Sequence, residues 1–164
     1  MSEVKLFNLV DDRVSLDPSS NVLTVIYFLS PECPLCINYT LSRRQLDEHF
    51  GNDSLEFYGI FSKEWYFPQE VDEFTRKYGL AFTMLFDSDK ALAATLNATV
   101  TPEVFVLNSR SEIVYSGKID NWVNDLGKTK LEVSDHYLEN ALNSYLQGKE
   151  IGPKHTEPIG CLIE

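Results

Sequence analysis

Apolar residues are distributed along this chain in short runs that predict alternating strands and helices. The segment VLTVIYFL is continuously apolar and rich in β-branched and aromatic residues, which predicts a strand buried on both faces. LEFYGIFS, FTMLFD, EVFVLNS and SEIVYSG predict four further strands, the last two joined by a tight hairpin at Ser109 and Arg110. Near the N-terminus, VKLFNLV and RVSL flank the polar DDR and predict another β-hairpin.

Segments with helical periodicity separate most of these strands. In the last segment, apolar residues recur at helical spacing, namely Leu138, Ala141, Leu142, Tyr145 and Leu146. Capping residues and glycines mark the expected helix ends. The predicted helices are Pro34 to Phe50 ended by Gly51, Pro68 to a stop at Gly79, a short helix in SDKALAATLNA capped by Asp87 or Ser88, and a last helix capped by Ser134 and ended by Gly148.

The order of these elements predicts an α/β fold. Strands and helices alternate in the middle of the chain, which implies parallel strands joined by helical crossovers. The late hairpin adds antiparallel edge strands, so the central sheet is expected to be mixed. A chain of 164 residues is expected to form one domain. We assign residues 1–148 to this domain and residues 149–164, KEIGPKHTEPIGCLIE, to an irregular C-terminal extension.

The charge balance narrows the possible partners. The chain has 14 Lys and Arg against 25 Asp and Glu, a formal charge of −11. This argues against binding to nucleic acid or to an anionic membrane surface, since both need clusters of basic residues. The first residues show no signal peptide, and no apolar run approaches the ~20 residues of a membrane span. We therefore expect a cytoplasmic protein, or a periplasmic or exported one if an upstream signal has been removed.

The stretch FLSPECPLCINYT contains the candidate chemistry. Cys33 and Cys36 follow the predicted buried strand and begin the next helix, at the sheet edge where open α/β folds carry their sites. Unpaired backbone N–H groups at a helix start stabilise the reactive thiolate form of cysteine. Pro34 fits the first helical turn, where its missing N–H costs nothing. The spacing therefore suits Cys33 as a nucleophile and Cys36 as the thiol that resolves a mixed disulfide.

Two other interpretations use the same cysteines. They could be buried structural residues, although a chance CxxC between a strand and a helix is uncommon. Alternatively, Cys33, Cys36, His155 and Cys161 could form a Cys3His zinc site or a softer copper site. The spacing of the second pair is not diagnostic, and we expect no metal and no organic cofactor.

Three segments, VIYFLSPECPLC, VTPEVFVLN and EIVYSGKID, resemble the thioredoxin-like redoxins. The similarity is greatest to the alkyl hydroperoxide reductase/thiol-specific antioxidant type and to thiol-disulfide interchange proteins, and it runs from the N-terminal hairpin to the last helix. It implies a thioredoxin-like fold, with Cys33 as the attacking thiol and Cys36 as the resolving thiol. It also implies that Pro102 is a cis-proline facing them. The backbone of Thr101 would then offer hydrogen bonds to an extended substrate segment.

The chain departs from these families at several positions. Glu32 precedes Cys33 where thioredoxins carry tryptophan, and a nearby carboxylate disfavours a thiolate. Tyr27 stands where thioredoxins place a buried aspartate, so no proton acceptor for the resolving thiol is evident. Peroxiredoxins carry Pro-x-x-x-Thr-x-x-Cys, but Ile26 and Ser30 occupy the proline and threonine positions here. A peroxiredoxin-like peroxidase is therefore the weaker enzymatic interpretation.

The third cysteine, Cys161, lies in the C-terminal extension and allows two interpretations. Ile159, Leu162 and Ile163 could pin the tail to an apolar patch, with Cys161 as a small packed residue. The tail is also long enough to bring Cys161 to the CxxC edge as a third redox thiol or a metal ligand. The sequence favours the packed residue, and predicts that Cys161 is dispensable for the first turnover.

Together these features predict a thiol-disulfide oxidoreductase. Cys33 and Cys36 are its catalytic residues, and Thr101 and Pro102 shape the substrate contact. Its partners would be a disulfide-bearing or thiol protein and a thiol electron donor or acceptor. Reductants and oxidants share this motif, so the direction of electron flow is left open. The alternatives are a metal-binding or metallochaperone domain, a peroxidase, and a redox-inert interaction module with the same fold.

Overall fold

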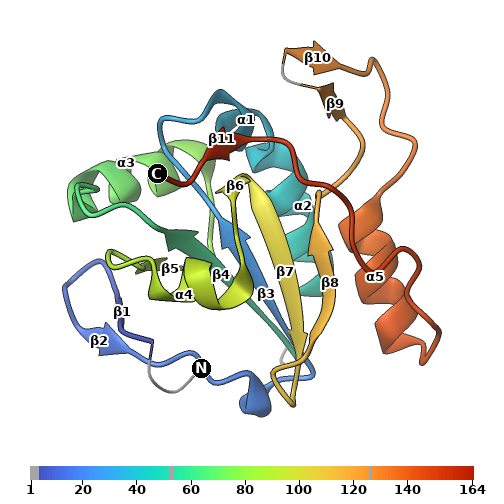
Figure 1. The fold of residues 1–164 in the computed structure, drawn as a ribbon, viewed down its shortest axis with the longest axis horizontal. Coiled ribbons are helices and arrows are strands. Elements are labelled where there is room, and N and C mark those ends of the chain that lie inside the picture. Colours follow the sequence, from blue (N-terminus) through green and yellow to red (C-terminus); the bar gives the residue numbers. More distant parts are fainter. Residues whose placement is uncertain (1–3, 52–53, 126) are drawn as a thin grey trace.

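The computed structural model describes residues 4–51, 54–125 and 127–164 (Figure 1). The helices are the 3-10 turn Pro18–Ser20, α1 (Pro34–Asn38), α2 (Thr40–Phe50), α3 (Pro68–Tyr78), α4 (Ala91–Leu96) and α5 (Tyr137–Leu146). The strands are β1 (Leu6–Phe7), β2 (Arg13–Val14), β3 (Leu23–Phe28), β4 (Leu55–Phe61), β5 (Thr83–Phe86), β6 (Val100–Thr101), β7 (Glu103–Asn108), β8 (Ile113–Gly117), β9 (Val123–Asp125), β10 (Lys128–Thr129) and β11 (Cys161–Leu162). Within these ranges, none of the helices has the length and apolarity needed to cross a bilayer.

The central sheet has the mixed architecture that the sequence predicts. In the part of the chain that is described, its strand order is β2-β1-β5-β4-β3-β7-β8. Strands β3, β4 and β5 are parallel, and β7 and β8 run antiparallel to their neighbours. The N-terminal hairpin of β1 and β2 joins the opposite edge by antiparallel pairing of β1 with β5. The prediction of an α/β fold with a mixed sheet is confirmed.

Both faces of the sheet are buried, because alternate residues of its strands point to two separate cores. In β3, Val25 and Tyr27 belong to the core that also contains apolar residues of α2, α3 and α5. Ile26 and Phe28 point the other way, into the core that α4 covers. This alternation explains why the strand is continuously apolar.

The helix predicted from Pro34 to Phe50 is divided into α1 and α2 at Tyr39. The Thr40 hydroxyl donates to the Ile37 carbonyl at 2.8 Å, and such a bond competes with the backbone ladder of a helix. The Tyr39 side chain is held separately, by a bond of 2.8 Å from its hydroxyl to Asp120. The division leaves Cys33 and Cys36 on a short helix of their own.

The first turn of α4 begins later than predicted. Lys90, in a left-handed conformation with φ of 57°, occupies the N-cap position that was expected for Asp87 or Ser88. The Asp87 carboxylate nevertheless accepts the backbone N–H groups of Leu92 and Ala93, each at 2.9 Å. Asp87 therefore performs the capping chemistry from outside the helix.

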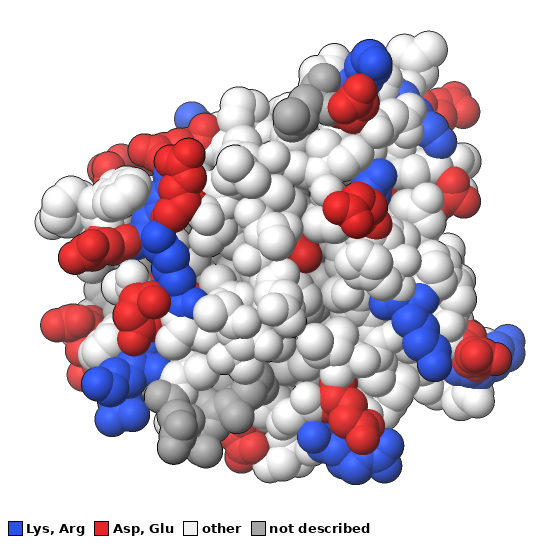
Figure 2. Space-filling view, viewed as in Figure 1, with Lys and Arg blue, Asp and Glu red and all other residues white. Residues whose placement is uncertain are grey.

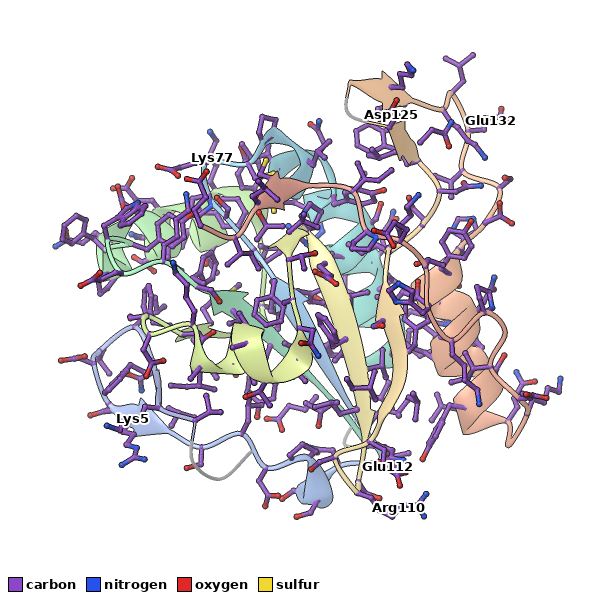
Figure 3. All side chains as sticks on the ribbon, in the orientation of Figure 1. Lys5, Lys77, Arg110, Glu112, Asp125 and Glu132 are labelled. Carbon is purple, nitrogen blue, oxygen red and sulfur yellow. The ribbon has the colours of Figure 1, made fainter. Side chains whose placement is uncertain are left out.

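Two other boundaries also differ from the sequence prediction. His136, and not Ser134, is the N-cap of α5, and Ser134 instead bonds to Asn121. The turn between β7 and β8 has four residues, since β7 ends at Asn108 and β8 begins at Ile113. Arg110 and Glu112 form an ion pair of 2.8 Å in this turn, at the opposite end of the sheet from α1 (Figure 3).

The C-terminal extension is largely irregular, as expected, and its named elements are limited to the two-residue strand β11. It first runs beside β8, where Ser116 exchanges backbone hydrogen bonds with Lys154 and Thr156 at 3.1 and 3.0 Å. It then crosses the end of the sheet, where β11 pairs antiparallel with β6 (Figure 1). The tail therefore returns to the edge of the sheet from which α1 begins.

The charges are spread over the surface. On the face seen in Figure 2, acidic and basic side chains lie mainly around the rim, and the centre is largely uncharged. No basic stripe crosses this face. This distribution agrees with the absence of basic clusters in the sequence.

Candidate active site

The two cysteines of the CxxC lie where the sequence predicts, at the carboxyl end of β3. Cys33 is the N-cap residue of α1, Pro34 is in its first turn, and Cys36 lies within the helix. The Cys33 side chain makes no N-cap hydrogen bond. The backbone N–H of Cys36 nevertheless lies near enough to contribute to the lowered pKa of Cys33. The start of α1 therefore supports a thiolate at Cys33.

Both thiols are shielded from solvent. The exposed fraction is 1% for Cys33 and 0% for Cys36, whereas Cys161 is partly exposed. A pocket of about 90 Å³ opens beside Cys33. Its lining comes from the end of β3, the segment before α3, β6 and the tail: Leu29, Ser30, Glu32, Cys33, Ser62, Lys63, Tyr66, Thr101, Cys161, Leu162 and Ile163.

Thr101 connects the CxxC to the C-terminal tail. As a thiol, Cys33 Sγ donates to the Thr101 carbonyl oxygen at 3.1 Å. The Thr101–Pro102 bond is cis, as the family resemblance implies. On its other side, Thr101 is the register partner of Cys161 in the pair of β6 and β11. The backbone edge that was expected to receive a substrate segment is thus occupied by the chain's own tail.

Cys161 lies beside the CxxC, a position that the sequence did not favour. Cys161 and Cys33 line the same pocket, and each influences the pKa of the other. The apolar anchoring that the sequence also suggested is present, because Ile159 and Ile163 pack against the two cores. Both interpretations of the tail therefore apply. The apolar residues on either side of Cys161 hold the tail against the domain, and this position of the tail puts the thiol next to Cys33.

Hydrogen bonding and burial separate the pKa values of the three thiols. Hydrogen bonds from the Cys36 thiol, and then from the Cys161 thiol, lower the pKa of Cys33 well below its ordinary value despite burial. Burial raises the pKa of Cys36 well above its ordinary value, and contact with Cys33 adds to this rise. Burial and the same contact raise the pKa of Cys161 to about 11. Cys33 is therefore the thiol that ionises first.

These pKa shifts predict distinct alkylation profiles for the three thiols. The thiolate is the reacting form, so iodoacetamide should modify Cys33 at a constant rate through neutral pH, with a decline only in acid, where the sulfur becomes protonated. Cys36 and Cys161 should react slowly at neutral pH and faster as the pH rises. Mass spectrometry of the alkylated peptides gives each rate, and equal rates at Cys33 and Cys36 near neutral pH would contradict the assignment.

Glu32 does not oppose the Cys33 thiolate as its position in the sequence suggested. Its carboxylate is largely exposed and forms an ion pair with Lys63 Nζ at 3.2 Å. Solvent and the lysine together screen the charge that would disfavour a nearby anion. Lys63 also lies over the rings of Trp65 and Tyr66, at 5.4 and 5.5 Å from their centroids. The pocket beside Cys33 therefore has a cation on its wall.

The aromatic segment after β4 is divided between core and surface. Tyr66 is buried and its hydroxyl bonds to Ser30 Oγ at 2.6 Å, on the wall of the pocket. Trp65 and Phe67 are 54% and 62% exposed, which is unusual for large aromatic side chains. Ser30, in the position where peroxiredoxins carry threonine, is thus held in place by Tyr66.

A buried arginine behind Cys36 escaped the sequence analysis. Arg43 is 0% exposed, and its Nη2 donates to the Cys36 carbonyl at 2.8 Å. Its positive charge opposes the rise that burial causes in the pKa of Cys36. The guanidinium also lies 5.9 Å from the centre of the Tyr27 ring. The position between Tyr39 and Leu46 on one helical stripe was the available signal, since an arginine there faces the core.

Asp47 completes this buried cluster from the next turn of α2. Burial raises the pKa of its carboxyl to about 8, although the charge of Arg43 acts in the opposite direction. The sequence left the resolving thiol without a proton acceptor because Tyr27 replaces the expected aspartate. The structure places a carboxyl group in the same cluster from a different element.

The Cys3His metal site considered from the sequence is not assembled. In the ranges that the structure describes, no group of three or more His, Cys, Asp or Glu residues is arranged to hold a metal ion. His155 lies beside β8, where its Nδ1 shares a hydrogen bond of 2.9 Å with Ser116. His155 therefore helps to hold the tail beside β8, and it does not line the pocket next to Cys33.

The chain is similar to a known protein family in sequence and to several solved proteins in structure. The sequence profile of the AhpC/TSA family matches residues 1–116, which include the CxxC but not Cys161. An uncharacterized conserved protein from Geobacillus kaustophilus has a similar structure, with a TM-score of 0.85, 25% identity and coverage of 98% of this chain and 87% of that one. No match was found among the curated proteins.

Two further structures share the fold at lower identity. A thioredoxin-like protein from Aeropyrum pernix gives a TM-score of 0.62 at 17% identity, with 88% of each chain covered. A secreted Mycobacterium tuberculosis disulfide oxidoreductase homologous to E. coli DsbE gives a TM-score of 0.57 at 23% identity, with 66% of this chain and 78% of that one covered. The predicted thioredoxin-like fold is confirmed. With 116 of its 164 residues matched by the family's profile, the chain belongs to the AhpC/TSA family.

Proposed function

We propose that the protein is a thiol-disulfide oxidoreductase whose redox pair is Cys33 and Cys36, in the motif Cys33-Pro34-Leu35-Cys36. One observation carries the proposal: Cys33 begins α1 with Cys36 one turn along the same helix, and interaction with Cys36 is the largest cause of the lowered pKa of Cys33. Membership of a redoxin family and the likeness to disulfide oxidoreductases support it.

The reaction follows from the separated pKa values of the pair. The Cys33 thiolate attacks one sulfur of a substrate disulfide, which forms a mixed disulfide and releases the first substrate thiol. Cys36 then loses its proton and attacks the Cys33 sulfur, which forms the Cys33–Cys36 disulfide and releases the second thiol. Two protein thiols are oxidised as one substrate disulfide is reduced, and the reverse steps oxidise a dithiol.

Groups around the pair have distinct supporting roles in this scheme. Arg43 stabilises the developing negative charge on Cys36, whose burial otherwise resists ionisation. Because Cys33 has a low pKa, it is also the better leaving group when the reaction runs in reverse. The partners would be a protein that carries the substrate disulfide or dithiol, and a second thiol compound that restores the starting state.

A single-turnover assay tests the proposed function. The fully reduced protein is mixed with a disulfide-bonded peptide, with no other thiol present, and the products are quenched in acid and mapped by mass spectrometry. One equivalent of peptide should be reduced, and the protein should gain an internal disulfide that contains Cys33. An unchanged peptide alongside fully reduced protein would rule the function out.

A further inference from the structure

The backbone of Thr101 contacts two cysteines from distant parts of the chain. Cys33 donates to its carbonyl at 3.1 Å, and Cys161 lies opposite it in the β6–β11 register. The approach is close because of Gly160: a Cβ at that position would lie 2.3 Å from the Thr101 carbonyl oxygen. The tail is therefore shaped to lie against Thr101, and this places the Cys161 thiol beside the Cys33 sulfur.

The surroundings of Cys161 differ from those of a packed structural cysteine. It is partly exposed and lines the pocket beside Cys33, together with the polar side chains of Ser30 and Lys63. Ile159 and Ile163 anchor the tail to the two cores, and Cys161 itself packs only partly against the first of them. Packing alone does not account for a thiol at this position.

We propose that Cys161 is a second resolving thiol, which attacks the Cys33 sulfur of a mixed disulfide as an alternative to Cys36. The inference rests on the proposed function and adds a step to it. The Cys161 thiol loses its proton, its sulfur bonds to Cys33, and the bond from Cys33 to the substrate sulfur breaks. The substrate leaves as a thiol after it takes up a proton, and the protein holds a Cys33–Cys161 disulfide.

The formation of a mixed disulfide favours attack by Cys161. Contact with the Cys33 sulfur contributes to the raised pKa of Cys161, and this contribution is lost when that sulfur is bound to a substrate. Lys63 lowers the pKa of Cys161 in either state. Cys36 also loses the contribution of Cys33 to its raised pKa, but it is 0% exposed, so burial, the largest cause, persists. The pocket of about 90 Å³ leaves room for a few substrate atoms next to Cys33 while Cys161 stays in place.

The test compares how much mixed disulfide accumulates when each resolving thiol is removed. The reduced Cys36→Ser variant is mixed with a disulfide-bonded peptide, and products are mapped after an acid quench. We expect little trapped adduct, because Cys161 resolves it, and we expect a disulfide that links the Cys33 and Cys161 peptides. The Cys36→Ser/Cys161→Ser double variant should trap nearly all of the protein as adduct. Cys36→Ala and Cys36→Ala/Cys161→Ser repeat the comparison in case serine perturbs the core.

The outcomes separate this inference from the proposed function. Equal trapping by the single and double variants, with no Cys33–Cys161 link, would overturn the role of Cys161 and leave the function of Cys33 intact. No adduct in either variant, and no internal disulfide, would overturn both. Loss of both thiols should raise the pKa of Cys33, because Cys36 and Cys161 lower it. Alkylation of Cys33 in the double variant is therefore measured at about pH 9, above the free-cysteine pKa of about 8.5, as the control that this thiol still reacts.

Discussion

The change Cys33→Ser should abolish disulfide reduction. A serine hydroxyl does not ionise at neutral pH, so no nucleophile is left to attack the substrate disulfide. The rate should fall at least about a hundredfold, to that of the peptide and thiol donor without protein. The measurement is steady-state reduction of a disulfide-bonded peptide with a dithiol as electron donor.

The fold should survive this substitution, so that the loss can be assigned to chemistry. A hydroxyl at residue 33 can donate to the same Thr101 carbonyl that the thiol now uses. Circular dichroism and the free energy of unfolding in urea serve as the control. Substantial reduction by well-folded Cys33→Ser would show that another residue attacks the substrate.

The change Gly160→Ala should detach β11 from β6. Its Cβ would lie 2.3 and 2.7 Å from the Thr101 carbonyl oxygen and carbon, and backbone atoms cannot move aside as a flexible side chain can. Once the tail moves away, the pKa of Cys161 should fall from about 11 toward the free-cysteine value of about 8.5. Its alkylation at neutral pH should accelerate by about tenfold to a hundredfold.

A glycine elsewhere in the same tail provides the matched control. A Cβ at Gly152 has no atom within 4 Å, so Gly152→Ala should leave the alkylation of all three cysteines unchanged. In Gly160→Ala, the pKa of Cys33 should also rise partway toward its ordinary value, because the hydrogen bonds from Cys161 are lost while those from Cys36 stay. Slow alkylation of Cys161 in Gly160→Ala would contradict the close packing of the tail on Thr101.

The central sheet was predictable because the burial of its strands is visible in the sequence as runs of apolar residues. VLTVIYFL has two buried faces, and its continuous apolar run predicts the position of β3 and of the cysteines that follow it. Helix ends were less predictable, since caps can act from outside the helix. Asp87 accepts from the first turn of α4 although Lys90 is the N-cap residue, a relation that depends on the course of the intervening turn.

The candidate site was predictable only where its residues are close in sequence. Cys33 and Cys36 share one helix, so their spacing alone indicates a redox pair. Cys161 reaches them through two-residue pairing of β11 with β6, and such short strands have no apolar pattern of their own. Arg43 was missed for a different reason. Its buried position depends on contacts with the carbonyl and the thiol of Cys36, and the sequence alone does not show these contacts.

The candidate site has a buried cysteine pair and, beside it, a third cysteine that is partly exposed. Cys33 and Cys36 are closed to solvent, and the tail supplies both the cover and a more accessible thiol. A macromolecular partner would have to displace the short β11 strand from Thr101 before it could pair there. Small disulfides could instead enter the pocket beside Cys33 with the tail in place.

A redox titration shows whether Cys33 takes part in a reversible disulfide within the chain. The protein, stripped of metal, is equilibrated with dithiol and disulfide buffers over a range of potentials, its free thiols are blocked in acid, and its disulfides are mapped. We expect one reversible transition in which a pair of thiols is lost and Cys33 becomes disulfide-bonded within the chain. If Cys33 stays a free thiol at every potential that oxidises ordinary protein dithiols, the protein is not a thiol-disulfide oxidoreductase.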